Sequence, residues 1–393
     1  MVVHLIPSVG PRSFGVGSVA LDLTRELNSE GCATEIWCLD SNADCEWAAT
    51  SSGLQLGKIR RFEGSWPGRL MWSMEMERNA NRASASISIV HQHAIWTGLS
   101  RIPNMLRERH GIQTIITPHG MLQKWALNKS IWKKRIALAL YERSNLTNAS
   151  CLHAVGENEL VDMRDYGLRN PVAVIPNGIS AGWLNSDGDG SSFRRKYGVH
   201  PDRRILLFLS RITPKKGLLM LLEAVDANRK AFEDWCLVIA GADEFNHKAE
   251  VDEEIRRRGL ADSVIMTGPL YGQLKRDSFA AASLFVLPSY SEGAPVVILE
   301  ALGAGVPVLA TKASPWQKLE NHGCGWWTEI DATSIAEALH VALSRPADQL
   351  CVMGKRGKSL AAEYTWANSA AMTMKLYQWL LGRQDKPAFV HTF

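Results

Sequence analysis

One strand–loop–helix–strand segment constrains the fold of this chain more than any other part of the sequence. Residues 282–287 are apolar apart from Ser283, as in a parallel strand buried on both faces, and Pro288 ends the run. Pro295 suits the first turn of a helix, where a missing amide costs no hydrogen bond, and the helix is expected to reach about Gly303. Residues 306–310 start another strand. The order predicts a βαβ unit, whose loop lies at the carboxyl end of a sheet, where ligands of open α/β proteins bind.

Two carboxylates belong to this segment, Glu292 in its loop and Glu300 inside its helix. Five helical steps separate Pro295 from Glu300, a rise of about 7–8 Å. The two acids are therefore expected to contact different parts of one long ligand rather than to share one proton. As a loop acid that contacts only the ligand, Glu292 should contribute little to stability. The alternative is that Glu300 is an acid favoured by the helix dipole and Glu292 is a solvated surface residue.

Length and composition favour an ordinary two-domain protein. The chain has 393 residues, which suits two α/β domains better than one core. Its net charge of +4 is too small to indicate a nucleic-acid partner. The seven cysteines form no C-x-x-C pair and are expected to be reduced. No apolar run reaches the ~18 residues of a membrane span, and the sequence opens on a strand without a basic leader. We therefore expect a cytoplasmic protein.

The amino-terminal part predicts a strand, a glycine-containing loop, helix 18–30 and a second strand. Within it, Gly15-Val-Gly17-Ser-Val-Ala20 matches the dinucleotide fingerprint G-x-G-x-x-A, and Asp40 follows twenty residues later as an acid that would bind a ribose. An NAD-dependent oxidoreductase is therefore one alternative. Against it, eight residues separate the first strand from Gly15, whereas the fingerprint has its first glycine directly after the strand.

Three histidines lie at the ends of predicted strands in the same half. Strand 86–91 ends in His91-Gln-His93, and strand 112–117 runs into Pro118-His119-Gly120. His91 and His93 could line a ligand site or merely end a strand, and the second interpretation is preferred. His119, directly before a glycine, is the stronger candidate for a ligand contact.

Residues 121–145 are the most basic stretch of the chain. The cations are Lys124, Lys129, Lys133, Lys134, Arg135 and Arg143, with Glu142 as the one acid. Trp125, Trp132 and several aliphatic residues alternate with them, as in segments that lie at a membrane interface. The stretch therefore predicts either peripheral binding to an anionic membrane surface or a solvated basic face over an ordinary core stripe.

Three motifs, in this order along the chain, resemble the signatures of the retaining glycosyltransferases of family 4. They are His119-Gly120, Arg211 with Lys216-Gly217, and Glu292 with Glu300. The resemblance spans almost the whole chain. It implies a GT-B fold, in which two doubly wound Rossmann-like α/β domains, 1–180 and 190–364, face each other across a cleft. Residues 365–393 would form a helix that returns to the first domain, followed by a tail.

The resemblance also implies a function for each motif. His119 and Glu292 would contact the sugar of a nucleoside diphosphate sugar, and Glu300 would bind the ribose hydroxyls. Arg211 and Lys216 would neutralise the diphosphate. This assignment suits the chemistry, because ionised carboxylates accept strong hydrogen bonds from hydroxyl groups and two fixed cations stabilise a leaving diphosphate.

Further donor-binding residues are implied on neighbouring loops. They are Gly15, Gly17, Gly241, Leu270, Gly293 and Ala294. One departure concerns the last two. The commonest family pattern has Gly-Phe-Gly here, whereas this chain has Gly293-Ala294-Pro295, and proline has no backbone N–H to offer the sugar.

No metal or other cofactor is expected, because Arg211 and Lys216 would act where other glycosyltransferases use a metal ion. Asp187-Gly-Asp189 matches the D-x-D motif of metal-dependent enzymes. It lies in a Gly/Ser/Asp-rich stretch, 185–192, that reads as a flexible linker rather than as a strand end, so we reject it as a metal site.

The sequence therefore predicts a retaining glycosyltransferase that moves a sugar from a GDP- or UDP-linked donor to a glycan or lipid-linked glycan acceptor in surface polysaccharide biosynthesis. A non-catalytic subunit that binds nucleotide sugars is a further alternative.

Overall fold

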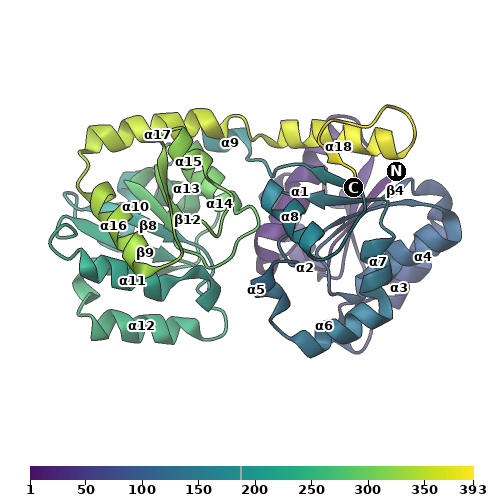
Figure 1. Cartoon of the computed structure of the whole chain (residues 1–393), viewed down its shortest axis with the longest axis horizontal. Helices are drawn as coiled ribbons and strands as arrows, with labels where there is room; N and C mark the ends of the chain where they lie inside the picture. Colours follow the sequence, from purple (N-terminus) through teal and green to yellow (C-terminus); the bar gives the residue numbers. More distant parts are fainter. Residues whose placement is uncertain (186–187) are drawn as a thin grey trace. The chain divides into compact units, whose positions relative to one another are not determined.

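A computed structural model of the chain describes residues 1–185 and 188–393. These residues divide into two compact units, each built around one mainly parallel sheet (Figure 1). The first unit is Met1–Gly178 together with Trp366–Phe393, and the second is Ile179–Thr365.

The second unit contains the βαβ segment that the sequence singles out. Over the described residues its sheet has six strands, paired in parallel in the order β10-β9-β8-β11-β12-β13. The strands are β8 (Arg204–Leu209), β9 (Trp235–Ala240), β10 (Val264–Gly268), β11 (Leu284–Leu287), β12 (Val308–Thr311) and β13 (Gly325–Thr328). Numbered along the chain, this is the order 3-2-1-4-5-6 of a doubly wound sheet, whose direction of winding switches between β8 and β11.

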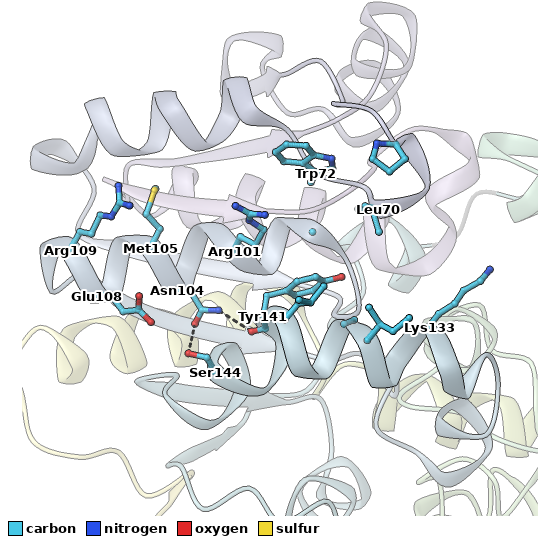
Figure 2. A pocket seen from close by; sticks show the side chains of 15 residues that line it. Leu70, Trp72, Arg101, Asn104, Met105, Glu108, Arg109, Lys133, Tyr141 and Ser144 are labelled. Carbon is cyan, nitrogen blue, oxygen red and sulfur yellow. Dashed lines mark hydrogen bonds between the residues drawn. The ribbon is translucent and has the colours of Figure 1, made fainter.

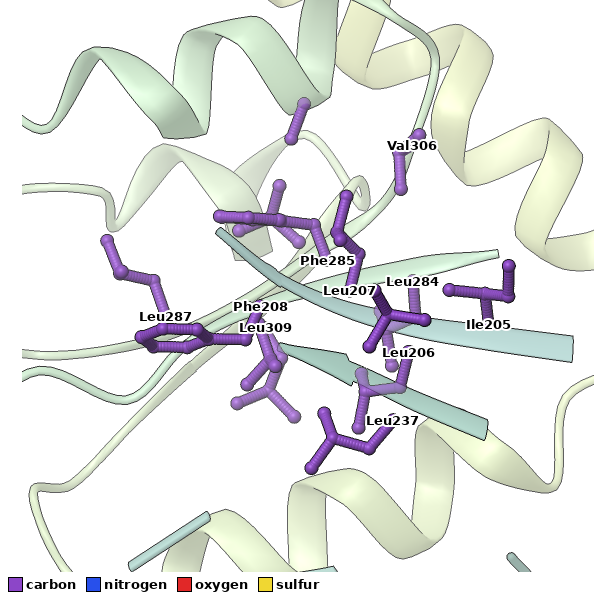
Figure 3. Packing of buried hydrophobic residues seen from close by; sticks show 14 of the residues in the cluster. Ile205, Leu206, Leu207, Phe208, Leu237, Leu284, Phe285, Leu287, Val306 and Leu309 are labelled. Carbon is purple, nitrogen blue, oxygen red and sulfur yellow. The ribbon is translucent and has the colours of Figure 1, made fainter. Parts of the chain in front are cut away.

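Helices cover both faces of this sheet. They are α9 (Ala181–Leu184), α10 (Gly190–Tyr197), α11 (Leu218–Ala227), α12 (His247–Arg257), α13 (Gly272–Ala281), α14 (Val296–Gly303), α15 (Lys318–Asn321), α16 (Ala332–Leu343) and α17 (Ala347–Ala361). α11 packs beside α12 and α16, whereas α14 packs beside α17 (Figure 1). Because β8 is covered on both faces, residues 205–208 are all apolar and fully buried, and they pack against Leu237 and Phe285 (Figure 3).

The first unit has the same winding. In the part of the chain that the structure describes, its strand order is β14-β7-β6-β5-β4-β1-β2-β3, parallel except for β14 beside β7. The strands are β1 (Val2–Leu5), β2 (Thr34–Cys38), β3 (Ile59–Arg61), β4 (Ile89–His93), β5 (Gln113–Thr117), β6 (Cys151–Ala154), β7 (Val172–Val174) and β14 (Val390–His391). Its switch point lies between β1 and β4.

Helices also flank the first sheet. They are α1 (Phe14–Ser29), α2 (Asn42–Ser52), α3 (Met74–Arg82), α4 (Arg101–His110), α5 (Lys124–Leu127), α6 (Ile131–Ala137), the π-helical segment η6 (Leu138–Glu142), α7 (Arg143–Thr147), α8 (Glu157–Asp165) and α18 (Trp366–Leu380). The carboxy-terminal helix α18 packs beside α1 (Figure 1). The sequence-based prediction that the last helix returns to the first domain is therefore confirmed.

The main βαβ segment is confirmed, with β11, α14 and β12 close to their predicted limits. Two predictions in the first half are wrong at their boundaries. α1 begins at Phe14 rather than at residue 18, because a 3-10 turn over Pro11–Ser13 leads directly into the helix. β4 begins at Ile89 and extends to His93, since both histidines pair with β5 instead of standing beyond the strand.

The stretch 185–192, predicted to be a flexible linker, is packed against the second unit in its described part. Its described part packs against α13, where a Cβ on Gly190 would lie only 2.7 Å from the carbonyl oxygen of Ala280. The backbone N–H of Asp189 donates to Asp277 on α13 at 2.8 Å. Glycines in this stretch therefore allow close packing rather than mobility.

Membrane spans and disulfides were both predicted to be absent. Within residues 1–185 and 188–393, no helix combines the length and apolarity needed to cross a membrane. The seven cysteines are free thiols, and the closest described pair, Cys38 and Cys45, has its sulfur atoms 3.8 Å apart.

Candidate functional site

Four of the predicted site residues lie at the carboxyl edge of the second sheet, beside its switch point. Arg211 and Lys216 follow β8, and Glu292 follows β11. Glu300 lies in α14, the helix that this loop enters. Because ligands of doubly wound sheets bind where two neighbouring loops diverge, the structure brings these residues to the expected position.

Two glycines allow the loops of this edge to approach one another. A Cβ on Gly217 would lie 2.0 Å from the carbonyl oxygen of Pro288, and Gly217 has a φ of +70°. A Cβ on Gly241 would lie 1.8 Å from the carbonyl oxygen of Ser210. In addition, the backbone N–H of Tyr290 donates to the carbonyl of Lys215 at 2.8 Å. The loops after β8, β9 and β11 therefore form one packed backbone platform.

Lys216 and Glu292 form a buried ion pair on this platform. Lys216 Nζ lies 2.5 Å from Glu292 Oε1, which also accepts a hydrogen bond from Ser289 Oγ at 2.5 Å. Burial alone would raise the pKa of Glu292. The charges of Lys216 and Lys215, with hydrogen bonds from Lys216 and Ser289, outweigh that effect and hold the pKa below its usual value.

The prediction that Glu292 contacts only the ligand is therefore wrong. Its side chain is buried and paired within the protein. Removing one partner of a buried ion pair leaves an uncompensated charge, which typically costs about 3–5 kcal/mol. Glu292 thus contributes to the stability of the platform, and its contact with a ligand stays a prediction.

Arg211 pairs with an acid, Glu244, that was not among the predicted site residues. Its Nη1 donates to both carboxylate oxygens of Glu244, at 3.0 and 2.7 Å. Glu244 lies in the loop after β9. This loop is joined to the Arg211 loop by two backbone hydrogen bonds, from the Ile212 N–H to the Ala242 carbonyl and from the Glu244 N–H to the Ile212 carbonyl. The signal that could have found Glu244 is its position just beyond the apolar run 235–240.

Glu300 is paired through one of its two carboxylate oxygens, with a lysine from a neighbouring helix. Its Oε1 accepts a hydrogen bond from Lys275 Nζ of α13 at 2.6 Å. Its Oε2 is buried and has no hydrogen-bond partner among the residues that the structure describes. A buried oxygen without a donor costs free energy, so a ligand hydroxyl at this position would be stabilised. No local pattern pointed to Lys275, because it lies on α13, the helix that precedes β11.

The other predicted donor-binding residues of this unit surround the platform. Gly293 and Ala294 are half-buried in the loop before α14, which begins after Pro295 as expected. Gly241 supports the platform as described above. Leu270 lies in the hydrophobic core and is only 5% exposed. Their contacts with a donor stay predictions.

The glycines of the first unit do not form a free loop. Gly15 and Gly17 lie inside the first turn of α1, and a Cβ on Gly17 would lie 1.9 Å from Ser13 Oγ. Asp40 accepts hydrogen bonds from Ser8 Oγ at 2.7 Å and from the Val9 N–H at 2.5 Å. Its oxygens thus stabilise the turn after β1, and the fingerprint suggested for an NAD-dependent oxidoreductase loses its ribose-binding acid.

His119 lies in a strained turn at the end of β5. Its φ is +54°, and that of Gly120 is +74°. The buried carboxylate of Glu159 holds this turn by accepting from the Gly120 N–H at 2.6 Å and from the Val155 N–H at 2.8 Å. Burial raises the pKa of Glu159 to about 7. Glu159 was not predicted as a site residue, and its only sequence signal is its place shortly after the run 151–155.

The His119 ring is fixed from a second side. Its Nε2 lies 3.0 Å from His93 Nδ1, and the two rings stack. Burial, with the charge of His153, lowers the pKa of His119 to about 3. His119 is therefore neutral at physiological pH. His93, interpreted from sequence as a strand end, is the residue that hydrogen-bonds to the His119 ring and stacks on it.

The D-x-D motif falls partly outside the described residues, which exclude Asp187. Asp189 is the N-cap of α10, where its Oδ1 accepts from the backbone N–H groups of Ser191 and Ser192, each at 3.0 Å. Asp189 thus acts as a helix cap.

The basic segment 121–145 forms a separate surface. Trp132, Ile136 and Leu140, spaced four residues apart, are 75%, 61% and 73% exposed. Glu142, taken from sequence as the one acid of this surface, is instead buried and accepts from the Trp96 N–H at 2.7 Å. We call Trp132, Ile136 and Leu140, with the exposed cations between residues 124 and 143, the basic apolar face.

A pocket of about 560 Å³ opens beside this face (Figure 2). Its lining comes from residues 67–72, from Gly98 and α4, and from α6, η6 and the start of α7, and it includes apolar and cationic side chains. Among these are Leu70, Trp72, Ile136, Leu140, Arg101 and Lys133. Such a lining suits an amphipathic ligand better than a purely polar one.

Comparisons with known proteins agree in both units. Residues 14–178 match the family model described as "Glycosyl transferase 4-like domain", and residues 190–359 match "Glycosyl transferases group 1". The chain is 25% identical to "Alpha-maltose-1-phosphate synthase" of Mycolicibacterium smegmatis, over 93% of this chain and 95% of that protein. It is 26% identical to "GDP-mannose:cellobiosyl-diphosphopolyprenol alpha-mannosyltransferase" of Komagataeibacter xylinus, over 97% and 94%.

A solved structure shows the same fold. Anabaena Alr3699/HepE in complex with UDP and glucose aligns with a TM-score of 0.78, at 17% sequence identity, over 97% of this chain and 100% of that one.

Replacing Glu159 tests the turn that carries His119. In Glu159→Gln, a neutral amide offers one oxygen to two backbone N–H groups, and its own NH2 group would face the other. We expect a loss of about 1–3 kcal/mol in stability and a lower calorimetric melting temperature for the first unit. Glu157→Gln, at an exposed position in the first turn of the same helix, is the control. Equal melting temperatures for the two variants would contradict the assignment.

Proposed function

The chain belongs to the glycosyl transferases group 1 family, with the GT-B fold, and is a glycosyltransferase of glycan biosynthesis; on this premise we propose that it transfers a sugar, with retention of anomeric configuration, from a nucleoside diphosphate sugar. The acceptor in this proposal is a glycan or a lipid-linked glycan of a surface polysaccharide.

The Oε2 of Glu300, which lacks a hydrogen-bond partner within residues 1–185 and 188–393, carries the proposal for the donor. This oxygen is buried at the switch point of the sheet, and Lys275 occupies only the other oxygen of the carboxylate. A ribose offers two adjacent hydroxyl donors, and hydrogen bonds to a charged acceptor are stronger than neutral ones. We assign Glu300 to the ribose of the donor nucleotide for this reason.

Cations near Glu300 support a diphosphate in the same ligand. Arg211, Lys215 and Lys216 lie in the loop after β8, and the amino-terminal end of α14 faces the same edge of the sheet. Fixed positive charges and helix N-termini both stabilise phosphate oxygens. We propose that they stabilise the leaving diphosphate without a metal ion, with Glu292 and His119 contacting the transferred sugar.

The donor base and the acceptor are proposed only as classes. Of the proteins similar to this chain, one is named for GDP-mannose and a diphosphopolyprenol-linked acceptor, and another was solved with UDP and glucose. GDP- and UDP-linked sugars are therefore both candidate donors. The pocket beside the basic apolar face supports an acceptor with an apolar part.

Transfer of an isotopically labelled sugar tests the proposal. The chain is incubated with GDP- and UDP-sugars and with glycan or polyprenol-linked glycan acceptors, and the anomeric configuration of the product is read by NMR. We expect a product that retains the configuration of the donor, formed equally well with EDTA. An inverted product would contradict retention, and activity lost in EDTA and restored by Mn²⁺ would contradict metal independence. Nucleotide-sugar binding without transfer to any acceptor would instead support a non-catalytic subunit.

Glu300→Ala tests the ribose assignment. The variant loses a charge-assisted hydrogen bond worth about 1.5–3 kcal/mol, so the Kd of the free nucleoside diphosphate should rise roughly 10- to 150-fold by calorimetry. Glu337→Ala, at an exposed position of α16, is the control for removing a carboxylate from this unit. An unchanged Kd in Glu300→Ala, with circular dichroism showing an intact fold, would exclude the ribose role.

We also propose that the basic apolar face binds an anionic membrane surface, where a lipid-linked acceptor would be met. Each Lys or Arg at such a surface contributes about 1 kcal/mol. Wild-type protein should therefore sediment with anionic liposomes at low salt and much less with neutral ones. Lys133→Glu/Arg135→Glu should abolish sedimentation, whereas Lys355→Glu/Lys358→Glu on α17 should not. Binding that ignores lipid charge or survives the first pair would favour a solvated face and a soluble acceptor.

A further inference from the structure

A row of seven polar side chains crosses the first sheet at its switch point. In order, they are His119, His93, His4, Tyr377, His91, Thr117 and His153. They come from β1, β4, β5, the turn after β5, β6 and α18. Except for the partly exposed His119, each is at least nine-tenths buried. Water is therefore excluded from most of the row, and its members must satisfy one another.

The first half of the row joins His119 to α18. His119 Nε2 lies 3.0 Å from His93 Nδ1, and His93 Nε2 lies 3.0 Å from His4 Nδ1. His4 Nε2 then lies 3.0 Å from the hydroxyl oxygen of Tyr377.

The second half returns from α18 to β6. The Tyr377 hydroxyl lies 2.9 Å from His91 Nδ1, and His91 Nε2 lies 2.8 Å from Thr117 Oγ1. Thr117 Oγ1 lies 3.0 Å from His153 Nδ1, and His153 Nε2 lies 2.9 Å from the backbone carbonyl oxygen of Ile175. Both ring nitrogens of His4, His91, His93 and His153 are thus engaged.

The backbone carbonyl of Ile175 can only accept a hydrogen bond, and this fixes the donor and the acceptor of every hydrogen bond in the row. His153 Nε2 must carry the proton, so Nδ1 of the neutral ring accepts, and the Thr117 hydroxyl donates to it. Having used its one hydrogen, Thr117 must accept from His91 Nε2. The reverse direction would set a lone pair of His153 against lone pairs of Thr117.

The same reasoning continues to His119. With its proton on Nε2, His91 accepts at Nδ1 from the Tyr377 hydroxyl, which in turn accepts from His4 Nε2. His4 Nδ1 then accepts from His93 Nε2, and His93 Nδ1 accepts from His119 Nε2. One orientation therefore satisfies the whole row with all five histidines neutral.

We infer that this row is a single proton-ordered hydrogen-bond chain that holds His119 in the Nε2–H tautomer and leaves its Nδ1 as an acceptor for a hydroxyl of a sugar ligand. Across the described residues, no hydrogen-bond partner lies on Nδ1 of His119. Thr117 and Tyr377 act as positioning residues, through the histidines. Only the identification of the ligand as a sugar rests on the proposed function.

Burial supports the neutral state that the chain requires. It lowers the pKa of His4 to about 3 and that of His153 to about 4, and it holds the pKa values of His91 and His93 well below normal. A charged histidine would carry two N–H groups and would break the sequence of donors and acceptors.

Three of these rings also satisfy the spacing of a metal site. His4, His91 and His93 place ligand nitrogens within 4.8 Å of one another. A metal ion would need lone pairs that already accept hydrogen bonds in the ordered chain. Metal binding is therefore the competing use of the same rings.

The experiment interrupts the hydrogen-bond chain at Thr117, a residue that does not contact the proposed sugar ligand. Thr117→Val removes the hydroxyl at nearly constant volume, and Thr117→Ser keeps it. Tyr377→Phe breaks the chain at a second, independent point. In each full-length protein, ¹⁵N-labelled histidine is observed by NMR, and the His119 signal is identified by its loss in His119→Gln. The kcat/KM for sugar transfer and the Kd of free nucleoside diphosphate are measured in parallel.

If the hydrogen-bond chain orders the protons, His119 has one tautomer in the wild type, protonated at Nε2. Thr117→Val and Tyr377→Phe should then each show a mixture of His119 tautomers. We expect kcat/KM to fall about two- to tenfold in both, the scale of one neutral hydrogen bond, and to recover in Thr117→Ser. The Kd of the sugar-free nucleotide should not change.

Three results would overturn the inference. They are a wild-type His119 protonated at Nδ1, a tautomer that stays single in both interrupting variants, and a zinc ion that the wild type retains stoichiometrically after dialysis. Absence of sugar transfer in the wild type would instead count against the proposed function, since the NMR result does not depend on turnover.

Discussion

Close backbone contact at the carboxyl edge of the second sheet is the constraint on which the candidate site depends. Gly217 and Gly241 lack the Cβ atoms that would otherwise lie 2.0 and 1.8 Å from neighbouring carbonyl oxygens. Any side chain there would separate the loops after β8, β9 and β11. The buried pair of Lys216 and Glu292 joins two of these loops, so its geometry depends on the same approach. The platform is therefore assembled by packing before any ligand arrives, as preorganised electrostatic stabilisation requires.

The charges on this platform are nearly balanced. The four cations Arg211, Lys215, Lys216 and Lys275 lie beside three acids, Glu244, Glu292 and Glu300. The cations inferred from sequence as partners of a diphosphate are thus partly neutralised by the protein. A diphosphate would have to compete with Glu244 for Arg211. How far Arg211 transfers from Glu244 to the diphosphate governs whether the fixed cations can stabilise the leaving group without a metal ion. In contrast, the Oε2 of Glu300 has no partner to displace among the described residues.

The parts of the fold that follow from local pattern could be predicted from sequence. An apolar run located β11, and Pro295 located the start of α14, because burial on two faces and a first-turn proline leave local signals. The partners of the site residues could not. Lys275 meets Glu300 across 25 residues, and Tyr377 meets His91 across 286, so both contacts arise from tertiary packing. The same limit explains why Glu292 was expected to contact only the ligand and why no side-chain partners were predicted for His91 and His93.

A crystal structure of the chain with a bound nucleoside diphosphate tests the central claim most directly. The account predicts a ribose hydroxyl at about 2.5–3.0 Å from Glu300 Oε2, with the diphosphate against the loop that carries Arg211 and Lys216. A nucleotide bound instead at the carboxyl ends of β1 and β4, beside Gly15 and Asp40, would contradict it.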